Sequence, residues 1–210
     1  MPVRGSLSWL TCPGTPWPAD GRPGELREHV MTVNQATFRE ALAHVPTAVS
    51  VVTTVDVRGE PWGVTVGTLG SLSLAPPLVL FCLDRSSASH DVLTTSARFL
   101  INVLGDRQAE VAAWFSNRGG HGFDGHHTTV HGLPAISEAL TRLLCVQNGL
   151  IRGGDHTIVI GSVENIEIGT GTPLVYYERG YRSLADPPAE SVNPLARRVV
   201  RTVADAHNRR

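Results

Sequence analysis

Apolar and small polar residues alternate between Gly63 and Leu74. A period of two predicts a strand with one face on a core. The core face is expected to hold Val64, Val66, Leu72 and Leu74, and the other face Gly63, Thr65, Gly67, Ser71 and Ser73, with Leu69 out of phase. Glycines on a strand let a flat ligand approach the backbone, so the small face is a candidate binding surface as well as a candidate solvated one.

An uninterrupted apolar run from Leu78 to Leu83 predicts a second strand, buried on both sides. Pro76 and Pro77 separate it from the first. The loop after this strand carries one guanidinium and three hydroxyls, and a short helix over 91–97 is expected beyond it. Such groups, with free backbone N–H donors, suit a phosphate, although serines here are also common helix caps. The loop residues are Asp84, Arg85, Ser86, Ser87, Ala88 and Ser89.

Further elements follow from local periodicity and turn residues. Apolar residues at helical spacing predict a helix over about 33–44, which Pro46 ends, and another after Asp106 with an inner stripe of Gln108, Val111 and Phe115. β-Branched and apolar runs predict strands over 48–55, 99–104, 140–151 and 156–168, and a turn at 58–61 makes the first of them a hairpin with the Gly63 strand. The fold class is therefore β-rich α+β.

Composition limits the partners and the compartment. The 210 residues are 18% charged with a net charge of −1, whereas nucleic-acid or membrane-surface proteins need a basic excess. No apolar run reaches the ~18 residues that span a membrane. Of three cysteines, Cys82 and Cys145 lie in apolar runs and are expected to be reduced thiols, which favours the cytoplasm.

Three regions are expected from changes in composition. Residues 1–30, rich in proline and glycine, are expected to be a disordered extension, residues 31–186 a single domain, and residues 187–210 a tail with an amphipathic helix. Between 117 and 132, a Gly-rich string and several histidines suggest a dinucleotide loop or a metal site. Neither is predicted, because the string follows a helix and the histidines lack close acidic or thiol partners other than Asp124.

Five segments resemble the flavin reductase family, the small reductase partners of two-component flavin-dependent monooxygenases. They are FREALAHVPTAVSVVTT from Phe38, the stretch Gly63 to Asp91, FLINVL from Phe99, GGDHTIVIGSVE with His156, and YYERGYRSL from Tyr176. The resemblance covers about residues 33–185. It implies a split β-barrel, a homodimer, and hydride transfer from NADH or NADPH to FMN or FAD, with the reduced flavin passed to a monooxygenase.

The resemblance also assigns roles to residues of this sequence. It places His156 at the nicotinamide side as the catalytic residue, with Tyr181 covering the nicotinamide; by itself, His156 also fits a turn histidine bonded to Asp155. The serine loop with Arg85 would hold the flavin phosphate. Asn102 would lie near the edge of the flavin ring, and Thr65 to Thr68 would contact the ring and the ribityl chain. The expected cofactor-binding residues are Thr65, Val66, Gly67, Thr68, Ser71, Asp84, Arg85, Ser86, Ser87, Ser89, Asn102 and Phe123.

The sequence departs from the family pattern at two places. Gly67-Thr68 stands where Asn-Ser or Ser-Ser is common, which removes one side-chain partner of the flavin, and His121-Gly122 stands where a basic residue is common. Strict alternation also points Thr68 away from Thr65, so a bulge near Gly67 is needed for both to face the flavin.

The sequence contains no convincing catalytic triad or paired carboxylates. A flavin reductase needs none, because hydride transfer between stacked rings requires mainly positioning. The alternatives are a flavin- or pigment-binding split barrel without turnover, and an enzyme like pyridoxamine-phosphate oxidase, which would need a more basic phosphate pocket. FMN against FAD, NADH against NADPH, and the partner oxygenase all stay open.

Overall fold

The computed structural model describes residues 33–117, 123 and 127–184. Contacts divide the chain into two units at Arg39 and Glu40, and everything below concerns the unit that begins at Glu40. The boundaries expected at residues 30 and 186, the 187–210 helix and the His121-Gly122 departure lie outside the described residues.

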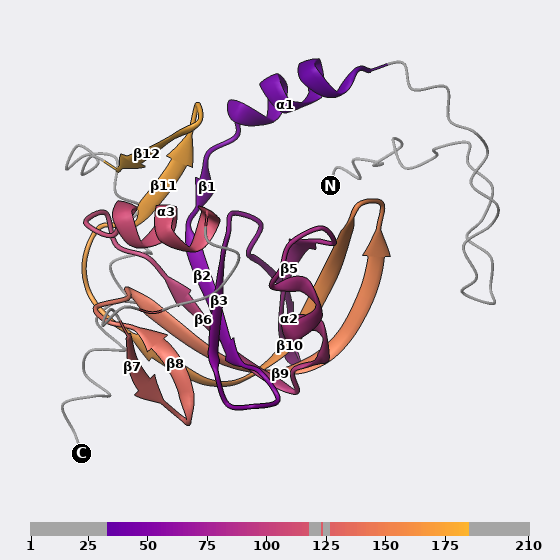
Figure 1. Ribbon diagram of the computed structural model, residues 1–210. Helices are drawn as coiled ribbons and strands as arrows, with labels where there is room; N and C mark the ends of the chain where they lie inside the picture. Colours follow the sequence, from indigo (N-terminus) through magenta and orange to yellow (C-terminus); the bar gives the residue numbers. More distant parts are fainter. Residues whose placement is uncertain (1–32, 118–122, 124–126, 185–210) are drawn as a thin grey trace, which may run out of the picture. The chain divides into compact units, whose positions relative to one another are not determined.

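Strands dominate the described chain, with three short helices among them (Figure 1). The predicted helix over 33–44, the β2–β3 hairpin and the predicted strands over 99–104, 140–151 and 156–168 are all present, with small shifts of boundary. In chain order the elements are α1 (Gln35–Ala43), β1 (Thr47–Ala48), β2 (Ser50–Val55), β3 (Pro61–Val66), β4 (Gly70–Leu74), β5 (Pro77–Asp84), α2 (His90–Thr95), β6 (Arg98–Val103), α3 (Ala109–Asn117), β7 (His127–Val130), β8 (Leu133–Ile136), β9 (Thr141–Gly153), β10 (His156–Ile168), β11 (Leu174–Tyr177) and β12 (Gly180–Ser183).

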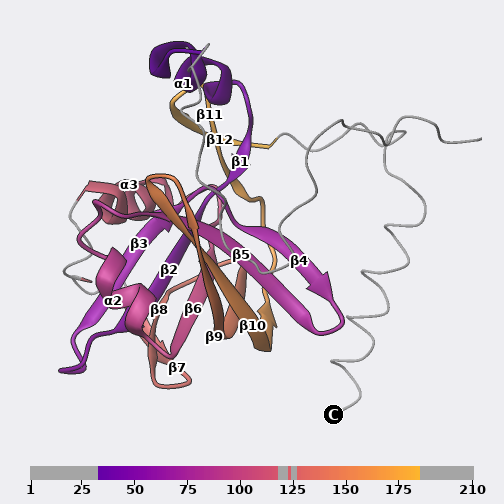
Figure 2. The same ribbon diagram turned by 90° about the vertical axis from the view of Figure 1, so that its right-hand side faces the viewer.

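Seven strands form one antiparallel sheet in the order β3-β2-β6-β9-β10-β5-β4. Its two edge strands, β3 and β4, follow one another in the chain but are not paired, so the sheet curls without closing. This is the split β-barrel that the sequence predicts. Strands β1, β11 and β12 form a smaller sheet, and β7 pairs with β8. In Figure 2 the β4–β5 hairpin extends away from α2 and α3.

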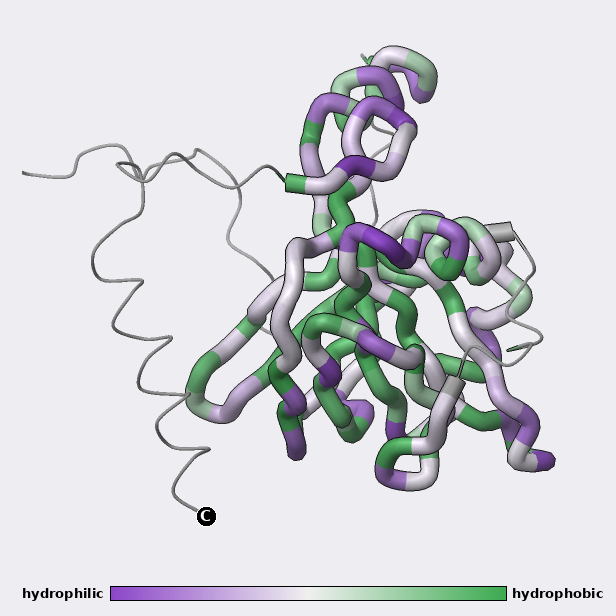
Figure 3. The backbone as a smooth tube through the Cα atoms, turned by 90° about the vertical axis from the view of Figure 1, so that its left-hand side faces the viewer, coloured by the Kyte–Doolittle hydropathy of each residue, from purple (hydrophilic) through white to green (hydrophobic). Residues whose placement is uncertain are grey.

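Apolar side chains fill the inside of the curled sheet, and Figure 3 shows hydrophobic strands ending in hydrophilic turns. The rings of Phe81 and Phe99 meet edge to face at 5.5 Å. A Cβ on Gly161 would lie 2.7 Å from the Phe99 ring, so only glycine fits there. On the other side, Phe115 of α3 packs so closely on β3 that a Cβ on Gly63 would lie 2.7 Å from its ring. These contacts fix α3 against β3.

The long alternation from Gly63 to Leu74 is interrupted, and this corrects the predicted core face. The strand stops after Val66 and resumes at Gly70. Because the break resets the alternation, Leu69 packs against the core, while Leu72 and Leu74 are 45% and 90% exposed. The predicted bulge near Gly67 is thus a break between strands.

Strand β5 has one buried face instead of two. Phe81 and Leu83 are buried, but Cys82 between them is half-buried. The run is uniformly apolar, and only the fold shows that its second face lines a cleft. The hairpins β7–β8 and β11–β12 were missed, because their strands are only four residues long.

Candidate functional site

Two clefts meet at the end of β3. The first, here called the serine-loop cleft, has a volume of about 470 Å³ and lies between the ends of β3 and β5 and the loop after β5. The second, the tyrosine cleft, has a volume of about 420 Å³ and lies between β3, β1 and the β11–β12 hairpin. Both are lined by Thr65, Val66, Gly67 and Ser116, so they adjoin one another at Gly67.

The serine-loop cleft gathers seven of the predicted residues. Four come from the end of β3 and the break after it, two from the end of β5 and its loop, and one from the start of β10. They are Thr65, Val66, Gly67, Thr68, Asp84, Ser87 and His156. The resemblance assigns Gly67 to the flavin site and His156 to the nicotinamide site. The structure brings these two residues, about 90 positions apart in the sequence, to one cleft.

Asp84 organises the serine loop through Ser86. Its Oδ1 accepts hydrogen bonds from the Ser86 N–H and the Ser86 hydroxyl, both at 2.7 Å. These bonds hold the pKa of the Asp84 carboxyl below its usual 3.8. Desolvation opposes them, and the nearby His156 and His90 add smaller lowering contributions. The carboxylate is therefore charged at neutral pH. It shapes the loop, and its own charge opposes a phosphate in the cleft.

The serine loop has two uncharged hydrogen-bond donors that can bind an anion, the Ser87 hydroxyl and the Ala88 N–H. The Ser87 oxygen accepts a bond from the Ser89 N–H at 3.3 Å, so the Ser87 hydroxyl can still donate its hydrogen. No hydrogen bond of the Ala88 N–H is found within the described residues, and both residues line the cleft. A phosphate beside Ser87 and Ala88 would be held by hydrogen bonds from these neutral donors.

His156 faces the same cleft from the first position of β10, directly across from Asp84. Its Nδ1 lies 2.7 Å from Asp155 Oδ1, so the local bond expected for a turn histidine exists. That contact lowers the pKa of the Asp155 carboxyl. The other ring nitrogen, Nε2, has no hydrogen-bond partner in the part of the chain that the structure describes. His156 is thus oriented by Asp155 and open to a ligand on its far side.

The two predicted threonines already use their hydroxyls within the protein. Thr65 donates to the carbonyl of Ala112 on α3 at 2.7 Å. The Thr68 oxygen accepts from the Cys82 N–H at 2.8 Å, which ties the break in the strand to β5. Both line the cleft, as the sequence requires, but their hydroxyls hold the cleft wall together.

Six predicted cofactor-binding residues do not line either cleft. Asn102 is fully buried, donating to the Val51 carbonyl at 3.0 Å and accepting from the Ile136 N–H at 3.0 Å. Phe123 is buried against Phe115, with ring centroids 4.9 Å apart. The structure therefore gives both a packing role in this chain. The other four are Ser71, exposed on β4; Arg85 and Ser86, exposed on the loop; and Ser89, buried beneath it.

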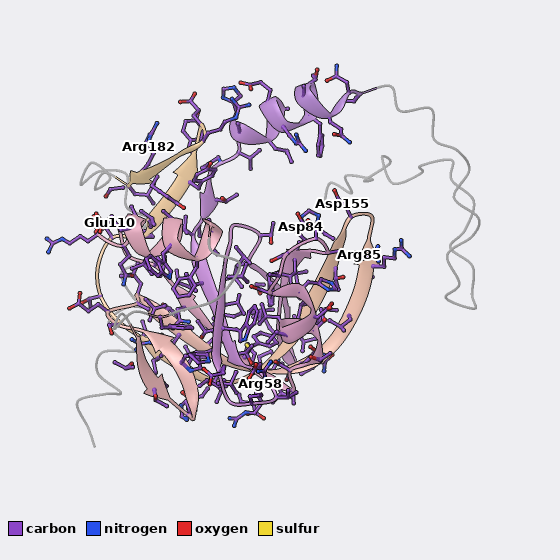
Figure 4. The ribbon with its side chains drawn as sticks, viewed as in Figure 1. Arg58, Asp84, Arg85, Glu110, Asp155 and Arg182 are labelled. Atoms are coloured by element: carbon purple, nitrogen blue, oxygen red, sulfur yellow. The ribbon has the colours of Figure 1, made fainter. Side chains whose placement is uncertain are left out.

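Figure 4 shows how the charged residues near the serine loop lie. Asp84 and Asp155 lie at the same end of the β9–β10 hairpin, and Arg85 extends to the outer side of that hairpin. Its backbone N–H donates to the Asp155 carbonyl at 3.0 Å, which fixes the loop to the hairpin turn. The Arg85 guanidinium, which the sequence analysis assigned to the phosphate, therefore points away from the serine-loop cleft.

Tyr181 lies in the tyrosine cleft, and not beside His156. Its ring meets Tyr176 edge to face, with centroids 5.4 Å apart. Arg179, on the turn between β11 and β12, lines the same cleft and forms an ion pair with Glu40. Thr47 of β1, the cross-strand neighbour of Tyr176, completes the wall. Sequence reasoning missed Thr47, Tyr176 and Arg179, which the pairing of the short strands β1, β11 and β12 brings to the cleft, and Ser116, which α3 brings there.

Other chemistry finds no support in the described residues. They contain no group of three or more potential metal ligands. Cys82 and Cys145 are unpaired, as predicted, and burial raises the pKa of the Cys145 thiol to about 12. None of the described helices has the length and apolar character needed to cross a membrane.

Comparison with known proteins identifies the family. Residues 42–185 match the model of the flavin reductase like domain. The chain belongs to the flavin reductase family. It is 38% identical over 151 residues to the reductase component of a 4-hydroxyphenylacetate 3-monooxygenase of Thermus thermophilus, covering 71% of this chain and 97% of the relative. It is 33% identical over 158 residues to an NADH:riboflavin 5'-phosphate oxidoreductase of Streptomyces pristinaespiralis, covering 72% and 89%.

Solved structures of flavin reductases share the fold. The NADH:FAD oxidoreductase of Streptomyces globisporus C-1027 superposes with a TM-score of 0.69 at 31% identity, covering 74% of this chain and 95% of that one. The family match spans the region in which the sequence resemblance was found, and the split barrel that it implied is confirmed.

Proposed function

We propose that this flavin reductase uses NADH or NADPH to reduce FMN or FAD and supplies the reduced flavin to a partner monooxygenase. The observation that carries the proposal is the pair of clefts that adjoin at Gly67, one lined by the serine loop and His156 and the other by Tyr176 and Tyr181. Relatives described as an NADH:riboflavin 5'-phosphate oxidoreductase, an NADH:FAD oxidoreductase and a monooxygenase reductase component support it.

The residues present fit a flavin. Gly67 offers bare backbone where a flat ring can approach, and the Ser87 hydroxyl with the Ala88 N–H can hold a phosphate. When bound, the flavin supplies the hydride acceptor and the nicotinamide the donor. The protein binds both rings, orients them in contact and excludes water from between them. Because every phosphate donor that lines the cleft is neutral, we expect binding weak enough for the reduced flavin to leave.

His156 and Tyr181 are proposed as the nicotinamide-binding residues. The Asp155 contact at Nδ1 holds the His156 ring, and Nε2 would be the atom that bonds the nucleotide. Tyr181 reaches the shared wall from the opposite cleft. A non-catalytic binding protein would keep the flavin contacts without needing either residue, so their variants separate the two functions.

A homodimer and a cytoplasmic location are proposed as well. Large apolar side chains stay exposed on β4 and β10, at Leu72, Leu74, Ile166 and Ile168, and a second copy would cover them. The two unpaired cysteines of the described chain suit a reducing compartment. Sedimentation of the purified protein tests the dimer.

The test of the function is oxidation of NADH and of NADPH, followed by loss of nicotinamide absorbance, with FMN, FAD and riboflavin added in turn. Rapid flavin-dependent oxidation establishes the reductase and names both substrates. Quenching of flavin fluorescence without any oxidation would show a binding protein instead.

A further inference from the structure

Thr47 contributes a short side-chain hydroxyl to the tyrosine cleft. It is half-buried on β1 and lines that cleft. No hydrogen bond of its Oγ1 is found within the described residues, whereas Thr65, Thr68 and Ser116 near it all bond backbone groups. A hydroxyl that faces a cleft and lacks a protein partner is free to bond a ligand.

Thr47 also fills the space of a missing side chain. Its Oγ1 lies 2.9 Å from the position that a Cβ on Gly67 would take, and its Cβ lies 3.6 Å from that position. The hydroxyl therefore stands against the space that a side chain at position 67 would enter. It reaches this point from another strand, because β1 pairs with β11 at Thr47 and Tyr176.

We propose that Thr47 is a flavin-binding residue, whose hydroxyl donates to the edge of the flavin ring in place of a side chain at Gly67. The inference rests on the proposed function, because it needs the flavin ring at Gly67. It explains why Gly67 is tolerated: the polar contact is supplied from β1, and a side chain at 67 would collide with it.

A double-mutant cycle tests this exchange, with flavin affinity measured by fluorescence quenching. Thr47→Val keeps the shape without the hydroxyl and should weaken FMN and riboflavin binding equally, by about three- to tenfold, since a neutral hydrogen bond contributes about 1 kcal/mol. Gly67→Ser alone should weaken binding because it displaces Thr47. The double variant Thr47→Ala/Gly67→Ser should bind more tightly than Thr47→Ala alone or Gly67→Ser alone.

Two controls separate binding from folding. Thr128→Val changes an exposed strand threonine outside both clefts and should leave affinity unchanged. Without flavin, Thr47→Val should unfold at the wild-type temperature. Wild-type affinity in Thr47→Val, or a double variant weaker than both singles, would overturn the role of Thr47 while leaving the reductase intact. A wild-type protein that neither binds flavin nor oxidises NADH would overturn the function and this inference together.

Discussion

The two clefts differ in how far their polar groups are already engaged. In the serine-loop cleft, Asp84 bonds Ser86, Thr68 bonds Cys82 and His156 contacts Asp155, so the wall is organised before a ligand arrives. In the tyrosine cleft, no partner of the Thr47 hydroxyl is found among the described residues, and an exposed pair with Glu40 is the only side-chain partner of Arg179 found among them. Exposed ion pairs contribute little, so the arginine can move at small cost. The side chains of the serine-loop cleft are thus held in place before a ligand binds, whereas Thr47 and Arg179 of the tyrosine cleft can rearrange around one.

Charge separates the two clefts as well. Asp84 and Asp155, both with lowered pKa values, stand at the serine-loop end, whereas Arg179 lines the tyrosine cleft and Arg182 lies farther along the same hairpin. Figure 4 shows Arg182 on β12, well away from Asp84 and Asp155. A phosphate at the serine loop must therefore be held despite a nearby carboxylate. The variants below test this difference, from the largest expected effect to the smallest.

Ser87→Asp should have the largest effect. A second carboxylate beside Asp84 would repel the flavin phosphate, and we expect FMN affinity to fall about 100-fold, equivalent to about 2.7 kcal/mol. Titration of FMN fluorescence measures this. Riboflavin lacks the phosphate and should bind as before, and Ser87→Ala should weaken FMN only a few-fold. Equal losses for FMN and riboflavin would mean that the phosphate lies elsewhere.

His156→Ala should slow NADH oxidation about tenfold, with flavin affinity within a few-fold of wild type. The reason is that His156 is proposed to contact the nicotinamide and not the flavin; a hydrogen bond to a polar ligand group of this kind contributes about 1–2 kcal/mol. Steady-state kinetics with saturating flavin measures the effect. Unchanged turnover would remove His156 from the nicotinamide site.

The sequence indicates cleft residues that belong to one contiguous motif. It does not indicate residues whose position depends on which strands pair. The serine loop and the Gly154-Asp155-His156 turn are each contiguous in the sequence, and the structure brings Ser87 and His156 to one cleft. Asn102 and Phe123 looked like ligand contacts, but the β6–β2 pairing and the packing of Phe115 bury them. Thr47 carries no local signal, because it is brought to Gly67 by a strand of two residues.

Tyr181→Leu should raise the KM for NADH about three- to tenfold, because an aromatic contact contributes about 0.5–1.5 kcal/mol beyond its buried area. Tyr181→Phe keeps the ring and should stay near wild type. Flavin affinity should be unaffected by either change if Tyr181 serves the nicotinamide. A loss of flavin binding in Tyr181→Leu would instead place the flavin ring in the tyrosine cleft, and the nicotinamide would then have to bind elsewhere.

Asp155→Asn should have the smallest effect, and it separates the charge of Asp155 from its geometry. The bond from His156, together with its charge, lowers the pKa of Asp155 from 3.8. A carboxyl with a lowered pKa stabilises the folded state above 3.8, and that contribution is lost as the pH falls below this value. The thermal unfolding temperatures of wild type and Asp155→Asn should therefore differ above pH 3.8 and converge as the pH falls below it. Because Asp155 is fully exposed, the difference should be small, and a gap that persists below pH 3.8 would show that the side chain contributes through shape and not through charge.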